Sequence, residues 1–272
     1  SDISSDLVLF NELVEVLINE EEQHPVADRI QADKLYDAID LSLNETAMVD
    51  EEFKAVLKDV IVSTPKTATN LFFNQLFGGR QSKAVLGDLL AVVLNNSMYT
   101  YKVAGPQVGI EQEIIRQSCN IIGYGSKSNG TFPTGGSMSN YMALVMGRDA
   151  KDSHARTKGM SKPLIIYTSK ESHYSNDKNA SFAGIGRDNI RYIKSDSVGR
   201  MIPSALEEQV KKDIEDGLVP TYVNSTAGTT VLGAFDPINE IADSLLPADW
   251  KARSPNVSRA GYSPAMASVP LK

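Results

Sequence analysis

The 272-residue sequence has one cysteine, three histidines and one tryptophan. The single cysteine, Cys119, cannot form an internal disulfide, and the three histidines do not have the spacing of zinc ligands. No apolar run approaches the roughly 18 residues of a membrane-spanning helix. The first residues contain no positively charged segment of the kind that begins a secretory signal. We therefore expect a cytoplasmic protein without a metal site.

Positive charge is scarce in the first 60 residues, where 16 acidic residues stand against 4 basic ones. The formal net charge of the whole chain is −7, and no block of clustered lysine and arginine occurs. Nucleic-acid binding needs such blocks to neutralise phosphates. We therefore expect neither a nucleic acid nor a membrane as partner. The acidic run Glu20–Glu22 is expected to be the solvated end of a helix.

Helical periodicity dominates the first part of the chain. Apolar residues recur every three or four positions over residues 5–22, and less clearly over 26–41 and 48–63. Asp50 or Thr46 is expected to cap the last of these helices. The pattern predicts a helical region with almost no strand.

Short continuous apolar runs begin after residue 160, and helical patterns fill the gaps between them. This alternation predicts an α/β fold with a parallel sheet whose two faces are both covered by helices. The runs that we predict as strands are 163–168, 190–193 and 220–224. A further helix is expected after Asp236 and Pro237, with Asp236 as its N-cap.

The change of pattern divides the chain into three parts. Residues 1–105 are predicted to be an N-terminal helical segment, and residues 106–245 to be part of a larger α/β domain. Residues 246–272 are rich in serine, proline and alanine and show no periodicity. We expect this tail to be unstructured or to come from a shifted reading frame.

The stretch Thr131–Asn140 places a proline and two glycines before a helical pattern. Glycines let backbone amides approach a ligand, and a helix N-terminus favours an anion. Gly136 and Ser137 are therefore candidates for binding a phosphate. The stretch lacks the lysine of a P-loop and the second flanking glycine of a serine-hydrolase elbow. The alternative is an ordinary capped helix.

Two further stretches follow predicted strands, where ligand crevices form in open α/β sheets. His173 lies just after the first strand and is a candidate for catalysis or ligand contact, with a structural role as the alternative. Small and hydroxyl-bearing residues fill positions 224–237, after the third strand, and suit close contact with a flat ligand. A turn rich in small residues is the alternative there.

These three stretches, together with a fourth at 70–79 followed by 98–102, resemble the group II pyridoxal-phosphate-dependent amino-acid decarboxylases. The likeness runs from about Asn70 to Ser244 and is strongest to the members that act on glutamate and cysteine sulfinate. It implies an incomplete fold-type I, aminotransferase-like large domain preceded by a helical segment. It also implies a homodimer, pyridoxal 5'-phosphate as the cofactor, and decarboxylation of an acidic L-amino acid such as glutamate, cysteine sulfinate or aspartate.

The resemblance implies roles for individual residues. Gly136 and Ser137 match the positions that hold the cofactor phosphate. His173 matches the histidine that stacks on the pyridine ring, which makes it the catalytic candidate, and Thr230 matches a threonine that lies against the cofactor. Three residues match the segment that approaches the substrate: Gln75, Leu76 and Phe77.

Two features of the family do not occur in the sequence. The family has a lysine that holds the cofactor covalently, usually directly after a histidine, and no histidine here precedes a lysine. The family's aspartate against the pyridine nitrogen, expected soon after the helix that follows Asp236, has no counterpart either. We therefore expect the chain itself to be inactive. The alternatives are another fold-type I enzyme, such as an aminotransferase, and a non-catalytic binding protein.

Overall fold

The computed structural model describes residues 3–27, 30–43, 45–74, 76–125, 127–245 and 267–270. In chain order its elements are α1 (Ile3–Gln23), η1 (Ala32–Lys34), α2 (Leu35–Ala38), α3 (Asp50–Ser63), α4 (Ser82–Leu94), α5 (Tyr101–Ala104), α6 (Pro106–Ile122), α7 (Gly136–Lys151), α8 (Ala155–Lys158), β1 (Leu164–Ser169), α9 (Ser175–Phe182), η2 (Arg187–Asn189), β2 (Ile190–Ile193), α10 (Pro203–Glu215), β3 (Val219–Ser225), α11 (Ile238–Leu245) and β4 (Ala267–Pro270). Within the described residues, no helix combines the length and the apolar character that crossing a membrane requires.

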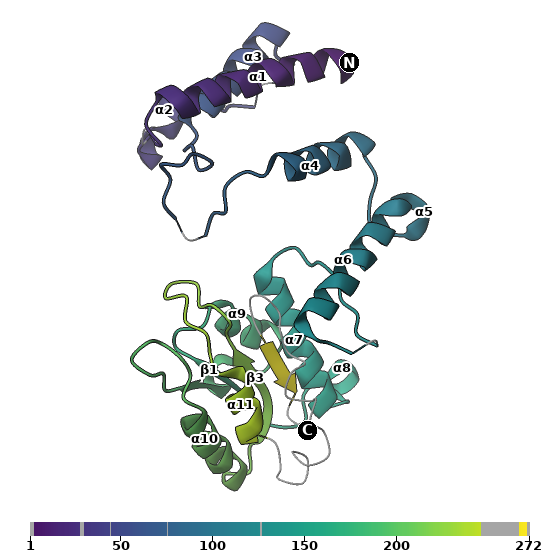
Figure 1. Cartoon of the computed structure of the whole chain (residues 1–272), viewed down its shortest axis with the longest axis vertical. Coiled ribbons are helices and arrows are strands. Elements are labelled where there is room, and N and C mark those ends of the chain that lie inside the picture. The colour runs from purple at the N-terminus through teal and green to yellow at the C-terminus, as the bar shows by residue number, and fades with distance from the viewer. Residues whose placement is uncertain are drawn as a thin grey trace. The chain divides into compact units, whose positions relative to one another are not determined.

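The chain divides into two compact units, Ser1–Asn96 and Ser97–Lys272. In the first unit α1 and α3 lie side by side (Figure 1), and the ammonium of Lys54 on α3 is 2.6 Å from the carboxylate of Glu12 on α1. Helices α3 and α4 contain no buried residue, so the first unit has little apolar core. The division into three parts expected from the sequence stays a prediction.

The second unit contains a four-stranded sheet with the order β2-β1-β3-β4. β1 is the middle of three parallel strands, with Ile166 beside Ile190 of β2 and Tyr222 of β3. The three predicted strands are therefore present, in the predicted parallel arrangement. β4 pairs antiparallel with β3. It belongs to the tail, most of which lies outside the described residues, so the prediction for the tail stays open.

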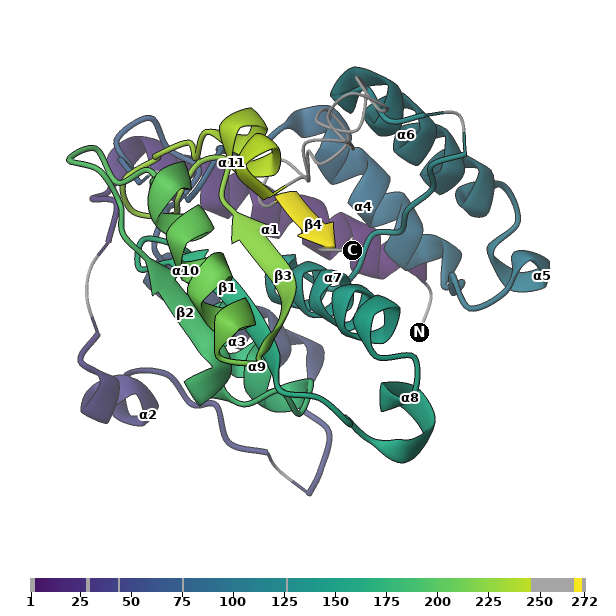
Figure 2. The same cartoon turned by 90° about the horizontal axis from the view of Figure 1, so that it is seen from below.

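Side chains of β1 alternate between two apolar clusters, one on each face of the sheet. Leu164 and Ile166 pack with side chains of α7 and α9. Ile165 and Tyr167 pack with side chains of α10 and α11. All six residues of β1 are buried. The sheet is therefore the middle layer of a three-layer α/β unit, with helices on both faces (Figure 2).

Helix α7 approaches β3 closely at Gly147. A Cβ atom added to this glycine would lie 3.2 Å from Cδ2 of Tyr222, which is closer than most real Cβ contacts. The missing side chain at Gly147 therefore sets the distance between α7 and the sheet.

Two local predictions for the first unit are wrong. Within the described part of 26–41, only η1 and α2 are helical. The carbonyl of Val26 accepts a long-range hydrogen bond from the amide of Lys66 at 2.7 Å, which replaces a helical partner. The N-cap of α3 is Val49, and neither residue predicted as its cap makes a capping bond.

Candidate active site

The carboxyl ends of β1 and β3 form a switch point of the sheet. The chain leaves β1 toward α9, which covers one face, and leaves β3 toward α11, which covers the opposite face. Connections that diverge in this way leave a crevice between the two strand ends, and ligands of open α/β sheets bind there. We therefore look for a ligand-binding site at this edge of the sheet.

Helix α7 begins with the two residues predicted to hold a phosphate. Gly135, just before it, has a φ of 133°, which side-chain-bearing residues rarely adopt. No side chain caps the helix, so the amides of Gly136 and Ser137 extend from its positive end without a helical acceptor. Both residues are exposed. The side-chain amide of Asn179 donates to the carbonyl of Ser137 at 3.0 Å and ties α7 to α9.

His173 lies in the loop between β1 and α9. Its Nδ1 accepts a hydrogen bond from the amide of Ser175 at 3.2 Å, which places the proton of the neutral ring on Nε2. The hydroxyl of Ser175 accepts from the side-chain amide of Asn140 on α7 at 2.8 Å. The ring of Tyr174 lies against the imidazole, with centroids 4.2 Å apart and planes inclined by 32°. His173 is thus positioned by both α7 and its own loop.

A buried polar network supports this loop. Thr168 Oγ1 lies 2.6 Å from Ser172 Oγ and donates to Asn224 Oδ1 at 3.3 Å. The side-chain amide of Asn176 contacts the same Asn224 oxygen at 3.3 Å and the carbonyl of His173 at 3.2 Å. Because the network joins β1, α9 and β3, it holds the backbone of His173 against the carboxyl ends of the strands.

Residues 226–236 form a tight loop after β3, closed by an antiparallel bridge between Ala227 and Phe235. Thr229 is buried, and its hydroxyl accepts a hydrogen bond from the amide of Ala234 at 3.0 Å. Thr230 is exposed. The two neighbouring threonines therefore differ. Thr229 closes the loop, and Thr230 is accessible to a ligand.

The loop ends at Asp236, whose buried carboxylate accepts hydrogen bonds from the amides of Met201 and Thr226, both at 2.7 Å. Burial raises the pKa of this carboxyl above its usual value, although the two hydrogen bonds act in the opposite direction. The predicted N-cap role of Asp236 is wrong, because its carboxylate joins the end of β3 to the turn before α10, and α11 begins at Ile238.

Two buried hydroxyls at the carboxyl edge have no hydrogen-bond partner within the described residues. They are Ser169 Oγ, at the end of β1, and Thr226 Oγ1, directly after β3. A buried polar group left unpaired costs about 1–3 kcal/mol, so such groups are rare unless a ligand or water pairs with them. A helix start without a cap, an imidazole and two unpaired hydroxyls fit a flat, phosphorylated and polar cofactor.

The residues predicted to contact the substrate belong to the first unit. Gln75 lies outside the described residues. Leu76 and Phe77 are 63% and 54% exposed. The ring of Phe77 meets that of Phe72 edge-on, with centroids 5.3 Å apart, and the amide of Leu76 donates to Asn74 Oδ1 at 2.8 Å. The roles of the three residues stay predictions.

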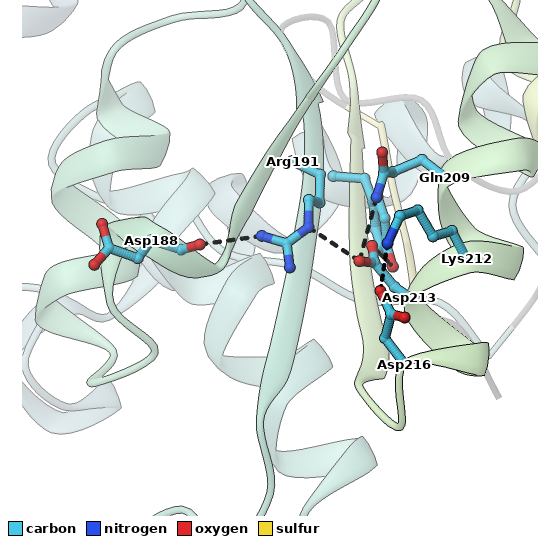
Figure 3. A network of polar contacts seen from close by, with 7 residues as sticks. Asp188, Arg191, Gln209, Lys212, Asp213 and Asp216 are labelled. Carbon is cyan, nitrogen blue, oxygen red and sulfur yellow. Dashed lines mark hydrogen bonds and ion pairs between the residues drawn. The ribbon is translucent and has the colours of Figure 1, made fainter.

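A second polar network lies on the face of the sheet that α10 covers. The sequence patterns do not predict it. Asp213 is 2% exposed and accepts hydrogen bonds from the Tyr167 hydroxyl at 2.9 Å, from Arg191 at 3.1 Å and from Gln209 at 3.2 Å (Figure 3). Arg191 also donates to the carbonyl of Asp188 at 3.0 Å. Burial and the hydrogen bond to Asp213 raise the pKa of the Tyr167 hydroxyl. The network joins β1, β2 and α10, and its role is structural.

These features are typical of α/β proteins that bind a phosphorylated ligand at the carboxyl edge of a parallel sheet. Residues 34–250 match the family described as "Pyridoxal-dependent decarboxylase conserved domain", and the chain belongs to this family. The match begins earlier than Asn70, where the motifs of the sequence first indicate the likeness.

Individual relatives agree with this assignment. The cysteine sulfinic acid decarboxylase of Mus musculus is 39% identical over 215 residues, which are 78% of this chain and 43% of the relative. The acidic amino acid decarboxylase GADL1 of Xenopus tropicalis is 35% identical over 238 residues, which are 87% of this chain and 46% of the relative. The crystal structure of mouse CSAD has a TM-score of 0.84 and 35% identity, and the match covers 89% of this chain and 52% of that one.

The chain therefore spans about half the length of the relatives that it matches. The predicted family and the predicted fold class, a fold-type I pyridoxal-phosphate-dependent decarboxylase domain, are confirmed. Pyridoxal phosphate is the cofactor of this family, as the sequence indicates. The roles of Gly136, Ser137, His173 and Thr230 stay predictions.

Proposed function

We propose that the chain is part of a pyridoxal-phosphate-dependent decarboxylase that acts on an acidic L-amino acid. The observation that carries the proposal is the meeting of the α7 start, the His173 loop and two unpaired buried hydroxyls at one edge of a parallel sheet. The names of the relatives, a cysteine sulfinic acid decarboxylase and an acidic amino acid decarboxylase, support the substrate class. Glutamate, cysteine sulfinate and aspartate are the candidate substrates.

Each site residue of the second unit has a defined task in this proposal. The amides of Gly136 and Ser137 and the Ser137 hydroxyl hold the phosphate, because they extend from the positive end of α7. His173 rests one ring face on Tyr174, so its opposite face is suited to stack on the cofactor ring. Thr230 contacts the cofactor from the loop after β3. When bound, the cofactor supplies the electron sink for decarboxylation.

The substrate class is tested with a complete protein that contains this chain. Release of CO2 is measured in competition among glutamate, aspartate, cysteine sulfinate, tyrosine, DOPA and histidine. We expect the three acidic amino acids to be preferred, because the amide of a glutamine such as Gln75 can donate to an acidic side chain, and a donor left unpaired in a buried site costs about 1–3 kcal/mol. The highest kcat/KM for an aromatic substrate would contradict the acidic assignment. Cofactor binding without CO2 release from any of the six would favour another fold-type I reaction or a binding role.

We further infer that the chain alone is inactive, since none of its lysines follows a histidine as in the family. Pyridoxal phosphate added to the chain and reduced with borohydride should label several exposed lysines weakly. Mass spectrometry of the peptides checks this. Stoichiometric labelling of one lysine would overturn the inference and identify the residue that holds the cofactor.

The two threonines of the loop after β3 offer a matched test of the cofactor site. Thr230→Val should weaken cofactor binding without changing thermal unfolding, because Thr230 is exposed. Thr229→Val should instead lower the melting temperature, because the amide of Ala234 loses its acceptor. Cofactor titration by absorbance and calorimetry of the complete protein separate the two effects. Equal effects of the two substitutions on binding would reject the assigned role of Thr230.

The proposed catalytic role of His173 is tested by His173→Phe in the complete protein. Phenylalanine keeps a ring that stacks but removes the Nε2 donor. We expect cofactor occupancy to be retained and kcat to fall by about 10²–10⁴-fold, the usual worth of proton transfer or positioning by such a group. Turnover close to that of the unmodified protein would reduce His173 to a structural residue.

The complete protein is also proposed to be a homodimer. The support is α4, where Leu86, Leu90 and Val92 are 54%, 52% and 77% exposed on a helix with no buried residue in the described chain. Light scattering should give a dimer mass, and Leu90→Glu should reduce it, whereas Val198→Glu, at a similarly exposed site in the second unit, should not. A monomeric protein contradicts the proposal. A cytoplasmic location, which the cysteine content and the lack of a membrane-length apolar run or a signal-like segment led us to expect, is checked by cell fractionation.

A further inference from the structure

The segment 67–79 connects α3 to α4 and carries the residues assigned to the substrate. Its described residues contain no helix or strand. Their hydrogen bonds are local: Thr69 bonds to Lys66, Phe72 to Thr69, and Leu76 and Phe77 to Asn74. These local bonds shape the segment but attach none of its middle to a helix.

The two residues that flank the segment are both attached to α1. Lys66, just before it, places its Nζ 3.8 Å from Glu20 Oε2. Arg80, just after it, places Nη2 2.5 Å from Glu21 Oε2. Glu20 and Glu21 are neighbours near the end of α1, so both ends of the segment are held at one place on one helix.

The Lys66 attachment is buried. Its side chain is 2% exposed and that of Glu20 is 13% exposed. Nζ of Lys66 also donates to the carbonyl of Val62, at 2.6 Å, at the end of α3. A buried ammonium is tolerated only when charged or polar partners replace its water. Since Glu20 and Val62 are those partners, Lys66 joins α1, α3 and the start of the segment.

The second attachment has a similar acidic partner. The Glu21 side chain is also 13% exposed, whereas Arg80 is 40% exposed. A guanidinium that donates to a largely covered carboxylate is more restricted than one in a fully exposed ion pair. Arg80 can therefore be replaced with less risk to folding than Lys66, which makes it the more useful residue for a test.

We infer that Glu20 and Glu21 are positioning residues that fix both ends of the 67–79 segment through Lys66 and Arg80, and so determine how Leu76 and Phe77 are presented to the substrate. The substrate part of this inference rests on the function proposed above. The attachment of the segment does not, and it is testable without cofactor or substrate.

The attachment is tested by amide hydrogen exchange of the full chain. Arg80→Gln and Lys66→Met should increase exchange in peptides from 67–79 by about tenfold, because the described residues of the segment have few other restraints. Lys54→Gln, which removes the Lys54–Glu12 pair between α1 and α3, should leave that exchange unchanged. Circular dichroism verifies that each variant is folded. Unchanged exchange in folded Arg80→Gln overturns the inference, even if Lys66→Met does not fold.

An exchanged pair gives a sharper test of the same contact. Glu21→Arg combined with Arg80→Glu restores opposite charges in swapped positions. We expect the double variant to return the exchange of the segment to within about twofold of the unmodified chain, whereas either single variant stays fast. A double variant as fast as the singles shows that the pair does not hold the segment.

The effect on substrate is measured in the complete protein. Arg80→Gln should raise KM for the acidic substrate by about tenfold with kcat changed less than twofold, since the segment positions substrate without taking part in the reaction. An unmodified protein that releases no CO2 would contradict the proposed function and leave the exchange result standing. An active protein in which Arg80→Gln leaves KM unchanged would instead contradict the positioning role.

Discussion

In the unit Ser97–Lys272, β1 buries every one of its six residues, whereas in the unit Ser1–Asn96 neither α3 nor α4 buries any. The first arrangement is that of a sheet closed on both faces by its own helices. The second contains ion pairs such as Lys54–Glu12 and Arg80–Glu21 and leaves much apolar surface uncovered. The difference indicates that the second unit contributes most of the chain's own stability.

Matched leucine substitutions should show the largest contrast between the units. Leu206 on α10 is fully buried, and Leu206→Ala should lower the free energy of unfolding by about 2–5 kcal/mol. Leu90 on α4 is 52% exposed, and Leu90→Ala should change it by less than about 0.5 kcal/mol. Urea unfolding of the full chain measures both. An equal cost at both positions breaks the comparison and means that a second copy covers α4 under the conditions of the experiment.

A smaller contrast is expected between the ion pairs of the two units. Asp213→Asn puts a side-chain amide among the donors from Tyr167, Arg191 and Gln209, and should cost about 1–3 kcal/mol. Lys54→Gln in the first unit should cause no measurable loss, because both partners of its pair are about half exposed. Thermal unfolding of the two variants gives the difference. A tolerated Asp213→Asn would mean that water or a rearranged Arg191 replaces the lost acceptor.

The smallest contrast between the units is expected in how the pH changes the contribution of one carboxyl in each unit to stability. Burial raises the pKa of Asp236 in the second unit, so its contribution to stability falls as the pH rises from the ordinary value of 3.8 through the raised pKa. Hydrogen bonds from Ser42 lower the pKa of Asp40 in the first unit, so its contribution is present above 3.8 and is lost as the pH falls through the lowered pKa.

The two carboxyls should therefore give slopes of opposite sign. Unfolding free energies of Asp236→Asn and Asp40→Asn, each compared with the unmodified chain between pH 3 and 7, test the signs, and NMR titration gives the two pKa values directly. Slopes of the same sign would show that Asp236 is hydrated in solution and that the two units do not differ in this respect.

The sheet was readable from the sequence because its strands are short, continuous apolar runs. Apolar and polar residues do not alternate in the run Leu164, Ile165 and Ile166, which is typical of a strand covered on both faces. Successive side chains of this strand are buried in the two apolar clusters on opposite faces of the sheet. The helix that begins at Gly136 follows two glycines and a proline, as the sequence predicts, and the phosphate-binding roles of Gly136 and Ser137 stay predictions. His173 was identified by its position after a strand, and its geometry adds the Ser175 and Tyr174 contacts.

The sequence did not predict the polar contacts between residues far apart in the chain. The acidic run at the end of α1 is expected to be solvated, yet Glu20 and Glu21 are only 13% exposed, because Lys66 and Arg80 arrive from about 50 residues away. Asp236 looks like a helix cap, yet its carboxylate binds the amide of Met201. Local patterns cannot indicate which of several distant donors a carboxylate meets. The antiparallel strand β4 could not be predicted from the sequence either, since its short sequence has no periodicity of its own.

The close approach of α7 to β3 at Gly147 couples the proposed cofactor site to a position far from it. Gly147 and Gly136 are eleven residues apart on one helix, or about 16 Å along its axis. A methyl group at Gly147 would press on the buried ring of Tyr222, and α7 would have to slide or tilt as one rod. If Gly136 and Ser137 bind the phosphate as proposed, a substitution at Gly147 alone would alter the affinity for phosphate although every residue that contacts the phosphate stayed the same.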